Sequence, residues 1–262
     1  MTDLDWAKID RSIGFRALLE REVFRFFTVF TQTIFPPIIS SFLFIFVFGF
    51  FLGRDIQVIQ GIPYLQFLIP GRVMMYLIEN AYANTSSSLF IARWSGHIQE
   101  LLVSPLSYSE MVLAMILGGL ARSFTVAFGV FCVSLFFVQF SIPHFWIICF
   151  FSLFVSLSFS CLGMIAGLLA EEWEHLSLLT TFVLTPLIYF GGVFHSAQTI
   201  PHIFQVLMHL NPIFYMVNGM RYGMLGTSDV NIVTAMSVIF GLFIFLFTVT
   251  VYMFKTGYKL RK

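Results

Sequence analysis

The stretch FFTVFTQTIFPPIISSFLFIFVFGFFLG, residues 26–53, contains no charged side chain. At about 1.5 Å of rise per helical residue, it is long enough to cross the roughly 30 Å hydrocarbon core of a bilayer. Pro36 and Pro37 lie within it. Because proline lacks the N–H that a helical hydrogen bond needs, they predict a break or kink. We expect this stretch to be the first membrane span of the chain.

The composition is that of a protein that lies almost wholly in a membrane. Of the 262 residues, 58% are hydrophobic and 10% are charged, whereas ordinary globular proteins carry about 25% charged residues. This excludes a soluble domain. We predict an all-α polytopic membrane protein, a single transmembrane domain over residues 1–262, with six transmembrane helices at residues 26–53, 63–90, 109–137, 144–170, 176–194 and 230–254.

Lysine and arginine are concentrated at the two ends of the chain. Five of the fourteen precede the first span, and four follow the last. Positive residues are retained on the cytoplasmic side, which predicts that both termini are cytoplasmic and agrees with an even number of spans. Residues 93–108 and 171–176 are then cytoplasmic. Residues 195–228, which prolines and glycines interrupt, are expected to form an outer or re-entrant helical segment.

Residues 5–27 have the pattern of an amphipathic helix. Apolar side chains share one half of a helical projection, and charged side chains share the other. The apolar half comprises Trp6, Ile9, Ile13, Ala17, Val23 and Phe27, and the charged half comprises Lys8, Asp10, Arg11, Arg21, Glu22 and Arg25. We expect this helix to lie in the membrane interface and to lead into the first span.

Residues 93–110, RWSGHIQELLVSPLSYSE, form a polar island between two spans. A helix over residues 93–105 would carry an apolar face beside a polar one. The apolar face comprises Trp94, Ile98, Leu101 and Leu102, and the polar face comprises Arg93, His97 and Glu100. Pro105 ends this helix, and Ser107-x-x-Glu110 predicts a capping box that starts the next one. Such a helix can bind another protein or rest on lipid headgroups, and the stretch by itself favours neither.

The sequence contains no complete catalytic or metal-binding motif. The dipeptide Gly-Lys, which a Walker A loop requires, does not occur, and neither G-x-S-x-G nor H-E-x-x-H is present. Glu172-x-x-His175 is half of a di-iron site without its second half. Histidines recur every seven residues at His195, His202 and His209, a spacing that could place metal ligands on one helical face. Histidines are also common at a membrane boundary, where they bind no metal. Three cysteines in apolar runs predict neither a disulfide nor a zinc site: Cys132, Cys149 and Cys161. We expect no enzymatic activity and no cofactor in this chain, and no nucleic-acid partner.

Four polar residues inside predicted spans are candidates for a transport pathway. They are Arg72, Glu79 and Asn80 in the second span and Arg122 in the third. Charges within a bilayer are costly and are commonly functional. In the alternative, structural interpretation, Arg72 extends to the outer interface and Glu79 pairs with Arg122. A stripe of small residues in the fourth span predicts close helix packing; it comprises Ser152, Ser156, Ser160, Gly163 and Gly167.

Four ordered motifs resemble the ABC-2 type permease family. The island is similar to the family pattern G-x-I-x-E-L-L-x-(S/A)-P and stands here as Gly96-His97-Ile98-Gln99-Glu100-Leu101-Leu102-Val103-Ser104-Pro105. The other three are Pro70-Gly71, the stretch from Thr185-Pro186 to Gly191-Gly192-Val193-Phe194, and Asn211-Pro212 with Tyr215 and Arg221-Tyr222-Gly223. The QTIFPP and NAYAN segments bring the resemblance close to the YadH-type inner-membrane permeases of Gram-negative bacteria. Arg72 departs from that group, in which the position is apolar.

The resemblance implies the permease subunit of an ABC exporter in the bacterial inner membrane. Two copies of the chain would form the pathway as a homodimer, and two copies of a separate ATPase, which holds ATP and Mg²⁺, would drive export. Substrates in the family include drugs, polysaccharides and lipid-linked glycans. The residues implied to couple to the ATPase are Arg93, Trp94, Gly96, His97, Ile98, Glu100, Leu101, Leu102, Ser104 and Pro105.

The alternative from another class is an ATPase-independent secondary transporter or channel. Such a protein should show inverted repeats and discontinuous helices in the middle of the membrane. The sequence shows no internal repeat and has few intramembrane acids for a proton relay. A membrane-embedded enzyme is disfavoured, because no nucleophile–base pair is evident in the sequence.

Overall fold

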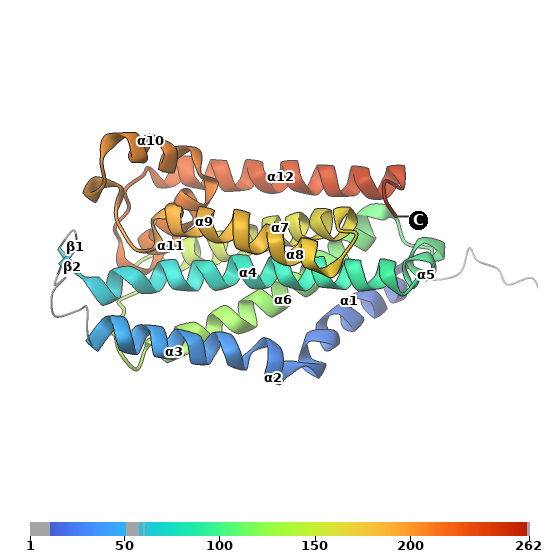
Figure 1. Cartoon of the computed structure of the whole chain (residues 1–262), viewed down its shortest axis with the longest axis horizontal. Coiled ribbons are helices and arrows are strands. Elements are labelled where there is room, and N and C mark those ends of the chain that lie inside the picture. Colours follow the sequence, from blue (N-terminus) through green and yellow to red (C-terminus); the bar gives the residue numbers. More distant parts are fainter. Residues whose placement is uncertain (1–10, 51–57, 60, 261–262) are drawn as a thin grey trace, which may run out of the picture.

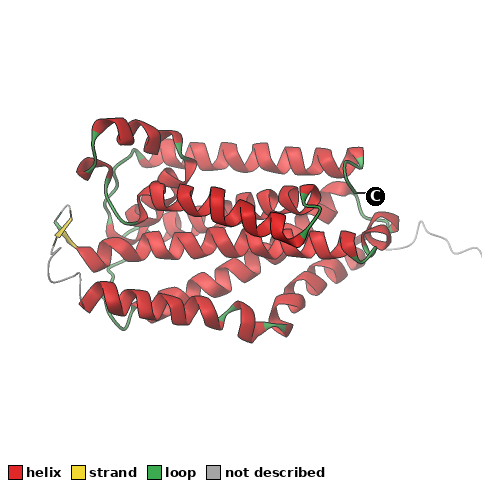
Figure 2. Ribbon diagram, in the orientation of Figure 1, coloured by secondary structure: helices red, strands yellow, loops and turns green. Residues whose placement is uncertain are grey.

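The computed structural model describes residues 11–50, 58–59 and 61–260. Long helices run side by side along most of its length, and short helices and turns lie at its two ends (Figure 1). Figure 2 shows that nearly all of the described chain is helical. The described strands form a single antiparallel hairpin, β1 Val58–Ile59 with β2 Ile62–Pro63. The predicted all-α class is therefore confirmed for the bundle.

The helices of the first half of the chain are α1 Arg11–Thr28, α2 Phe30–Thr33, α3 Phe35–Phe50, α4 Tyr64–Trp94, α5 Ile98–Val103 and α6 Tyr108–Ser134. The second half contains α7 Phe145–Leu169, α8 Trp173–Leu179, the π-helix η3 Thr180–Leu184, α9 Thr185–Ile188, the π-helix η4 Tyr189–Val193, the 3-10 turn η5 Ala197–Thr199, α10 His202–Leu210, α11 Pro212–Leu225 and α12 Ile232–Thr256. Within the described residues, five segments are long and apolar enough to cross a membrane: Phe30–Phe48, Tyr108–Ser134, Phe145–Leu169, Trp173–Val193 and Ile232–Thr256. They correspond to the first, third, fourth, fifth and sixth predicted spans.

The first span is broken, as its two prolines predict. Val29 and Ile34, each with a φ of −108°, separate α1 from α2 and α2 from α3. Pro36 and Pro37 fall in the first turn of α3, where a missing backbone N–H costs least. The interruptions therefore lie just before the prolines, and the chain follows a bent path from α1 to α3 (Figure 1).

The N-terminal helix buries a different face from the predicted one. Residues 5–10 of the predicted range lie outside the described residues. In α1, Glu22 and Phe26 are buried against the bundle, whereas Ile13 of the predicted apolar face is 66% exposed. The placement of Glu22 on the polar face was wrong, because its carboxylate accepts hydrogen bonds from the hydroxyl of Ser88 at 2.7 Å and from Arg21 at 2.9 Å.

The helix α4 is central to the bundle, although it is not among the five apolar segments. It packs against α3, α6, α7 and α11, and most of its residues are buried. Its polar side chains have partners inside the protein. The Thr85 hydroxyl donates to the Ser160 carbonyl at 2.7 Å, and the Asn80 amide donates to the Tyr76 carbonyl at 3.0 Å. This interior position explains how the predicted second span carries polar and charged residues away from lipid.

The small-residue stripe of α7 packs against α4 and α6. A Cβ added at Gly163 would meet the Thr85 hydroxyl, and it would lie 2.5 Å from the Tyr82 carbonyl oxygen. The Ser156 hydroxyl lies 3.0 Å from that of Ser123 in α6. The predicted packing role of this stripe is confirmed, and the contact lies within one chain.

Gly163→Leu is expected to destabilise the bundle, because the new side chain would overlap the backbone of α4. Overpacking of this kind costs about 1–3 kcal/mol. The matched control is Gly241→Leu in α12, where an added Cβ would meet no atom within 4 Å. The measurement is the temperature at which the detergent-purified chain loses its monodisperse size-exclusion peak. Equal temperatures for the two variants would show that α7 and α4 do not approach closely.

Candidate functional site

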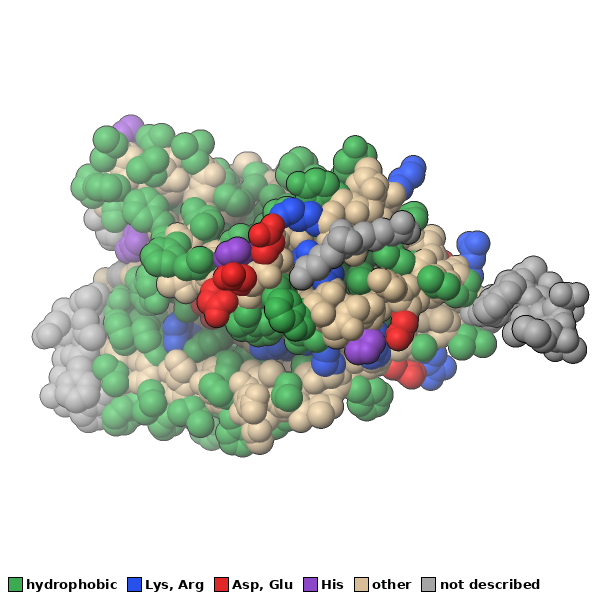
Figure 3. All heavy atoms as spheres, turned by 45° about the vertical axis from the view of Figure 1, so that its right-hand side comes forward, with side chains coloured by type: hydrophobic (Ala, Val, Ile, Leu, Met, Phe, Trp, Pro, Cys, Tyr) green, Lys and Arg blue, Asp and Glu red, His purple; other side chains and the backbone are tan. Residues whose placement is uncertain are grey.

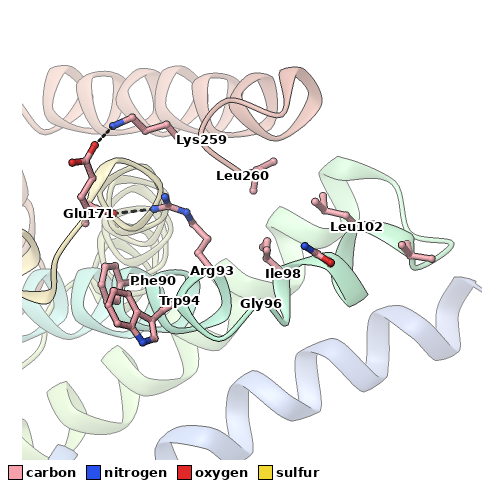
Figure 4. A pocket seen from close by; sticks show the side chains of 12 residues that line it. Phe90, Arg93, Trp94, Gly96, Ile98, Leu102, Glu171, Lys259 and Leu260 are labelled. Carbon is pink, nitrogen blue, oxygen red and sulfur yellow. Dashed lines mark hydrogen bonds and ion pairs between the residues drawn. The ribbon is translucent and has the colours of Figure 1, made fainter. Parts of the chain in front are cut away.

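A hollow of about 800 Å³ opens at the end of the bundle that carries α5. Figure 4 shows its walls: the last turn of α4, the α4–α5 turn, α5, the end of α7 and the chain that follows α12. Five of the predicted coupling residues line this hollow: Arg93, Trp94, Gly96, Ile98 and Leu102. The sequence motif and the hollow therefore coincide.

The predicted helix over residues 93–105 is in fact two helical elements joined by a turn. The first, α4, ends at Trp94, and α5 begins at Ile98. Between them Gly96 has a φ of +82°, a conformation that glycine adopts without the steric cost of a Cβ. Ser95 Oγ and His97 Nδ1 lie 2.7 Å apart across the same turn. The prediction of one continuous apolar face was wrong, because the turn leaves Trp94 69% exposed and Ile98 3% exposed.

Arg93 joins the end of α4 to the end of α7. Its guanidinium donates to the backbone carbonyls of Gly167, Leu168 and Ala170 at 2.8, 2.7 and 3.0 Å. The last carbonyls of a helix have no partner within the helix, and the helix dipole favours a cation beside them. Arg93 is thus a structural link, and it does not share a polar face with His97 and Glu100 as predicted.

A second link joins the end of α7 to the chain after α12. The ammonium group of Lys259 lies 3.0 Å from a carboxylate oxygen of Glu171 (Figure 4). This hydrogen bond, together with the positive charges of Lys259, His175 and Arg93, lowers the pKa of the Glu171 carboxyl. The pair is solvent-exposed, so its contribution to stability is small. The pair of Lys259 and Glu171 closes one side of the hollow.

The helix α5 is anchored from beneath by two apolar side chains. Ile98 belongs to a buried cluster that includes Leu89 of α4, Val112 of α6 and Phe254 of α12. Leu101 belongs to another cluster, with residues of α1 and α6 that include Leu18 and Met111. A displacement of α5 would therefore act directly on the cores that join α1, α4, α6 and α12.

The boundaries after α5 follow the predicted signals. Ser104 is extended, with a ψ of 154°, as the residue before Pro105 is expected to be, and its hydroxyl donates to the Leu101 carbonyl at 2.7 Å. The capping box of α6 is confirmed, because the Ser107 N–H donates to Glu110 at 2.7 Å and the Glu110 N–H donates to Ser107 at 3.3 Å. These bonds hold α5 at a set position between α4 and α6.

The outward side of this end presents both apolar and polar groups. Glu100 is exposed, and Val103 is 85% exposed. Trp94 stacks on Phe90 with ring centroids 6.1 Å apart, and Phe90 in turn meets the edge of Trp173 at 5.5 Å. Large exposed apolar side chains beside a hollow are typical of a surface that another protein binds.

Two of the four predicted pathway residues, Arg72 and Asn80, form hydrogen bonds to residues of their own helix inside the bundle. Arg72 is 6% exposed, and its guanidinium lies 3.0 Å from the Tyr76 hydroxyl and 4.1 Å from the centre of the Phe44 ring. Asn80 bonds the backbone of its own helix, one turn back. The suggestion that Arg72 extends to the outer interface was wrong, because aromatic rings hold its charge within the protein.

Glu79 and Arg122 do not form the ion pair that the structural interpretation required. Both side chains are half-buried, and within the described residues no hydrogen bond or ion pair reaches either of them. The buried Nε atom of Arg122 is left without a partner. Both residues therefore remain candidates for function.

A polar network at the opposite end of the bundle was not predicted. Arg221 is 1% exposed, donates to the Gly192 carbonyl at 2.7 Å, and lies over the ring of Phe67 at 3.7 Å. Asp229 lies 4.0 Å from the same guanidinium. Burial and the charge of Arg221 lower the pKa of His195, and Asp229 opposes this shift. The sequence does contain an arginine, Arg221, within the apolar outer segment. The motif that includes it gave no role for this side chain.

Two of the histidines considered as metal ligands, His209 and His175, have other partners. His209 Nδ1 lies 2.7 Å from the Gln205 carbonyl oxygen, and His175 Nδ1 accepts the backbone N–H of Glu171 at 3.3 Å. Over the part of the chain that the structure describes, no group of three His, Cys, Asp or Glu side chains could hold a metal ion.

The region of this chain that is similar to known proteins includes both the broken first span and the α5 end. The family profile described as ABC-2 type transporter matches residues 14–225. The inner membrane transport permease YadH of Escherichia coli K12 is 41% identical over 228 residues, which cover 87% of this chain and 89% of that protein. Nodulation protein J of Sinorhizobium fredii is 25% identical over 189 residues, which cover 69% and 70% of the two chains. The chain therefore belongs to the ABC-2 type transporter family.

Proposed function

We propose that this permease is the membrane subunit of an ATP-driven exporter and that a separate ATPase binds it at the α5 end. The observation that supports the proposal is the position of α5. Its inner side is buried in two clusters through Ile98 and Leu101, and its outer side exposes Glu100 and Val103. Family membership favours this function over an ATPase-independent transporter or channel.

The coupling follows from which helices α5 touches. A partner that pushes on the exposed side of α5 moves Ile98 and Leu101, and these side chains pack against α1, α4, α6 and α12. Packed interfaces respond to such displacements by moving between discrete arrangements. The hollow beside α5 would receive an apolar side chain of the ATPase, with Trp94 at its rim. Hydrolysis takes place on the partner chain in this scheme.

The pathway in this proposal lies between two copies of the chain. The centre of one bundle is filled by α4, which packs against α3, α6, α7 and α11. A route for a substrate would then follow an outer face of the bundle, and a second copy would cover it. The resulting assembly is a homodimer with two ATPase subunits.

The orientation proposed here places both termini in the cytoplasm of the bacterial cell. With α4 counted as the second span, which brings the total to six, α1, α5 and the end of α12 all lie on one side, as Figure 1 shows for their position along the bundle. Arginine and lysine residues of α1 and of the segment after α12 are then on the cytoplasmic side, where positive charge is retained. The helix α10 lies on the outer side.

Cysteines placed at three exposed positions will test this orientation in a background without Cys132, Cys149 and Cys161. Ser95→Cys in the α4–α5 turn and Thr256→Cys at the end of α12 should react with a membrane-impermeant maleimide only after the cells are opened. His202→Cys in α10 should react in intact cells when the outer membrane is made permeable. Labelling in the reverse order would contradict the six-span orientation.

Val103→Asp is expected to weaken binding of the ATPase while leaving the fold intact. Val103 is 85% exposed, so the substitution changes the surface of α5 and not its anchor. A charge placed in an apolar contact should lower the affinity at least tenfold, or about 1.4 kcal/mol. The measurement is the amount of a Walker A-containing subunit and of vanadate-sensitive ATPase activity that co-purifies with the tagged permease.

The matched control is Val58→Asp in the hairpin at the opposite end, where Val58 is 58% exposed. Glu100→Ala should have a smaller effect than Val103→Asp, because an exposed polar contact contributes little. Leu101→Asp is expected to lower the thermal stability of the permease itself, since Leu101 is 6% exposed. Equal recovery of the ATPase with Val103→Asp and Val58→Asp would show that α5 is not the docking element.

A further inference from the structure

Arg122 of α6 lies beside the interrupted segment of the first span. Four residues before it in α6, Gly118 packs on Glu22 of α1, and seven residues after it, Gly129 packs on Ile38 of α3. Residues at these spacings share one helical face. Arg122 is therefore on the face of α6 that α1 and α3 cover, between their two contacts. The interrupted segment from Val29 to Ile34 lies between the same two contacts along the first span.

The guanidinium of Arg122 has no hydrogen-bond or ion-pair partner among the residues that the structure describes. Its Nε is buried and unbonded, and among the described residues no hydrogen bond or ion pair reaches the rest of the side chain. The helix α1, which packs against α6, brings Arg25, a charge of the same sign, to this region. At about 1.5 Å per residue, Arg122 is about 20 Å from the start of α6, well inside the span. An unpaired charge at that depth is costly and needs a counter-charge.

Arg25 belongs to α1, the helix that packs on this face of α6, and its charge is only partly neutralised. It donates to the carbonyl oxygen of Asn84 at 2.7 Å and to the side-chain oxygen of the same residue at 3.0 Å. Its nearest carboxylate, Glu22, is 3.6 Å away and already accepts hydrogen bonds from Arg21 and Ser88. One carboxylate thus faces the guanidinium groups of Arg21 and Arg25, and the charge of Arg122 is left over. The local excess is positive.

This excess charge is open to one side of the bundle. The side chains of Arg25 and Arg122 are both half-buried, so part of each remains accessible. Figure 3 shows arginine or lysine side chains recessed among apolar ones on a face of the bundle. The break in the first span adds the exposed polar residues Thr28 and Gln32 near this level. An apolar surround with recessed cations suits a ligand that combines hydrocarbon with an anion.

We infer that Arg25 and Arg122 bind the phosphate group of an anionic lipid, which enters beside the break between α1 and α3. A guanidinium binds phosphate through two parallel hydrogen bonds, and the bond is strong because both groups are charged. The lipid tail stays against the exposed apolar residues of α2 and α3, such as Phe30 and Phe35. The phosphate comes from a bilayer phospholipid or from a lipid-linked cargo such as a polyprenyl phosphate.

The test uses the purified, delipidated chain in neutral detergent and requires no ATPase, so it is independent of the function proposed above. Phosphatidylglycerol, a polyprenyl phosphate and diacylglycerol are each titrated, and the bound lipid is counted by native mass spectrometry. Arg122→Gln should weaken binding of the phosphate-bearing lipids at least tenfold, and Arg122→Lys should weaken it less. Arg16→Gln is the matched control, because the Arg16 side chain is 81% exposed and pairs with Glu20 on the surface of α1.

A second measurement separates binding from a structural role. Because Arg122 bonds no other side chain or carbonyl in the described part of the chain, Arg122→Gln should leave the thermal denaturation temperature of the lipid-free chain unchanged or raise it. Tighter binding of the polyprenyl phosphate would assign the site to a cargo, and tighter binding of phosphatidylglycerol would assign it to a bilayer lipid. The inference is overturned if Arg122→Gln binds both lipids as the parent does, if diacylglycerol binds equally well, or if the lipid-free variant is destabilised.

Discussion

The structure depends on one constraint, that polar groups at membrane depth need partners within the protein. The helix α4 illustrates it, because it carries Arg72, Asn80 and Thr85 and yet occupies the centre of the bundle. Close approach of α7 makes this possible, since Gly163 leaves room for the α4 backbone and the Ser160 carbonyl accepts the Thr85 hydroxyl. The more apolar helices α3 and α12 lie outside, where hydrocarbon can cover them. In this bundle the helix that carries polar side chains, α4, is buried, and the apolar helices α3 and α12 lie on the outside. In a soluble protein, apolar surfaces are buried and polar ones face the solvent.

Arginine side chains connect the places where helices end or break. Arg93 binds the last carbonyls of α7, Arg25 binds the backbone of α4 from α1, and Arg221 binds the Gly192 carbonyl where the fifth span ends. Arg93 and Arg221 supply donors to carbonyl groups at helix ends, whereas Arg25 adds a bond to a carbonyl within the continuous helix α4. Arg221 thus stabilises the end of the fifth span, and at the break in the first span the Thr33 hydroxyl lies 3.2 Å from the Phe26 carbonyl oxygen and 3.0 Å from that of Val29. Arg122 differs from these three, because among the described residues its donors meet no carbonyl, and the proposed lipid site rests on this difference.

The two ends of the bundle have different characters. At one end, α5 is short, anchored by two buried side chains and exposed on its outer side, which suits the transfer of force from a partner. At the other end, the buried pair of Arg221 and Asp229 holds α11 to the end of the fifth span. Between them lie the interrupted first and fifth spans. A permease needs this combination, because an input of force at one side must change access at the other.

The sequence by itself determined the class of the protein, five apolar spans, the capping box at Ser107 and the end of α5 before Pro105, because each follows from local hydropathy or from backbone chemistry. It also located the α5 end through a motif. Tertiary structure alone decided where α4 ends, because the periodicity of residues 93–105 continues through Gly96 while the backbone turns there. It alone decided that Arg93 caps α7, that Glu22 is buried and that Glu79 and Arg122 stay apart. These facts depend on which helices meet at what level, and helical periodicity within one segment carries no information about its neighbours.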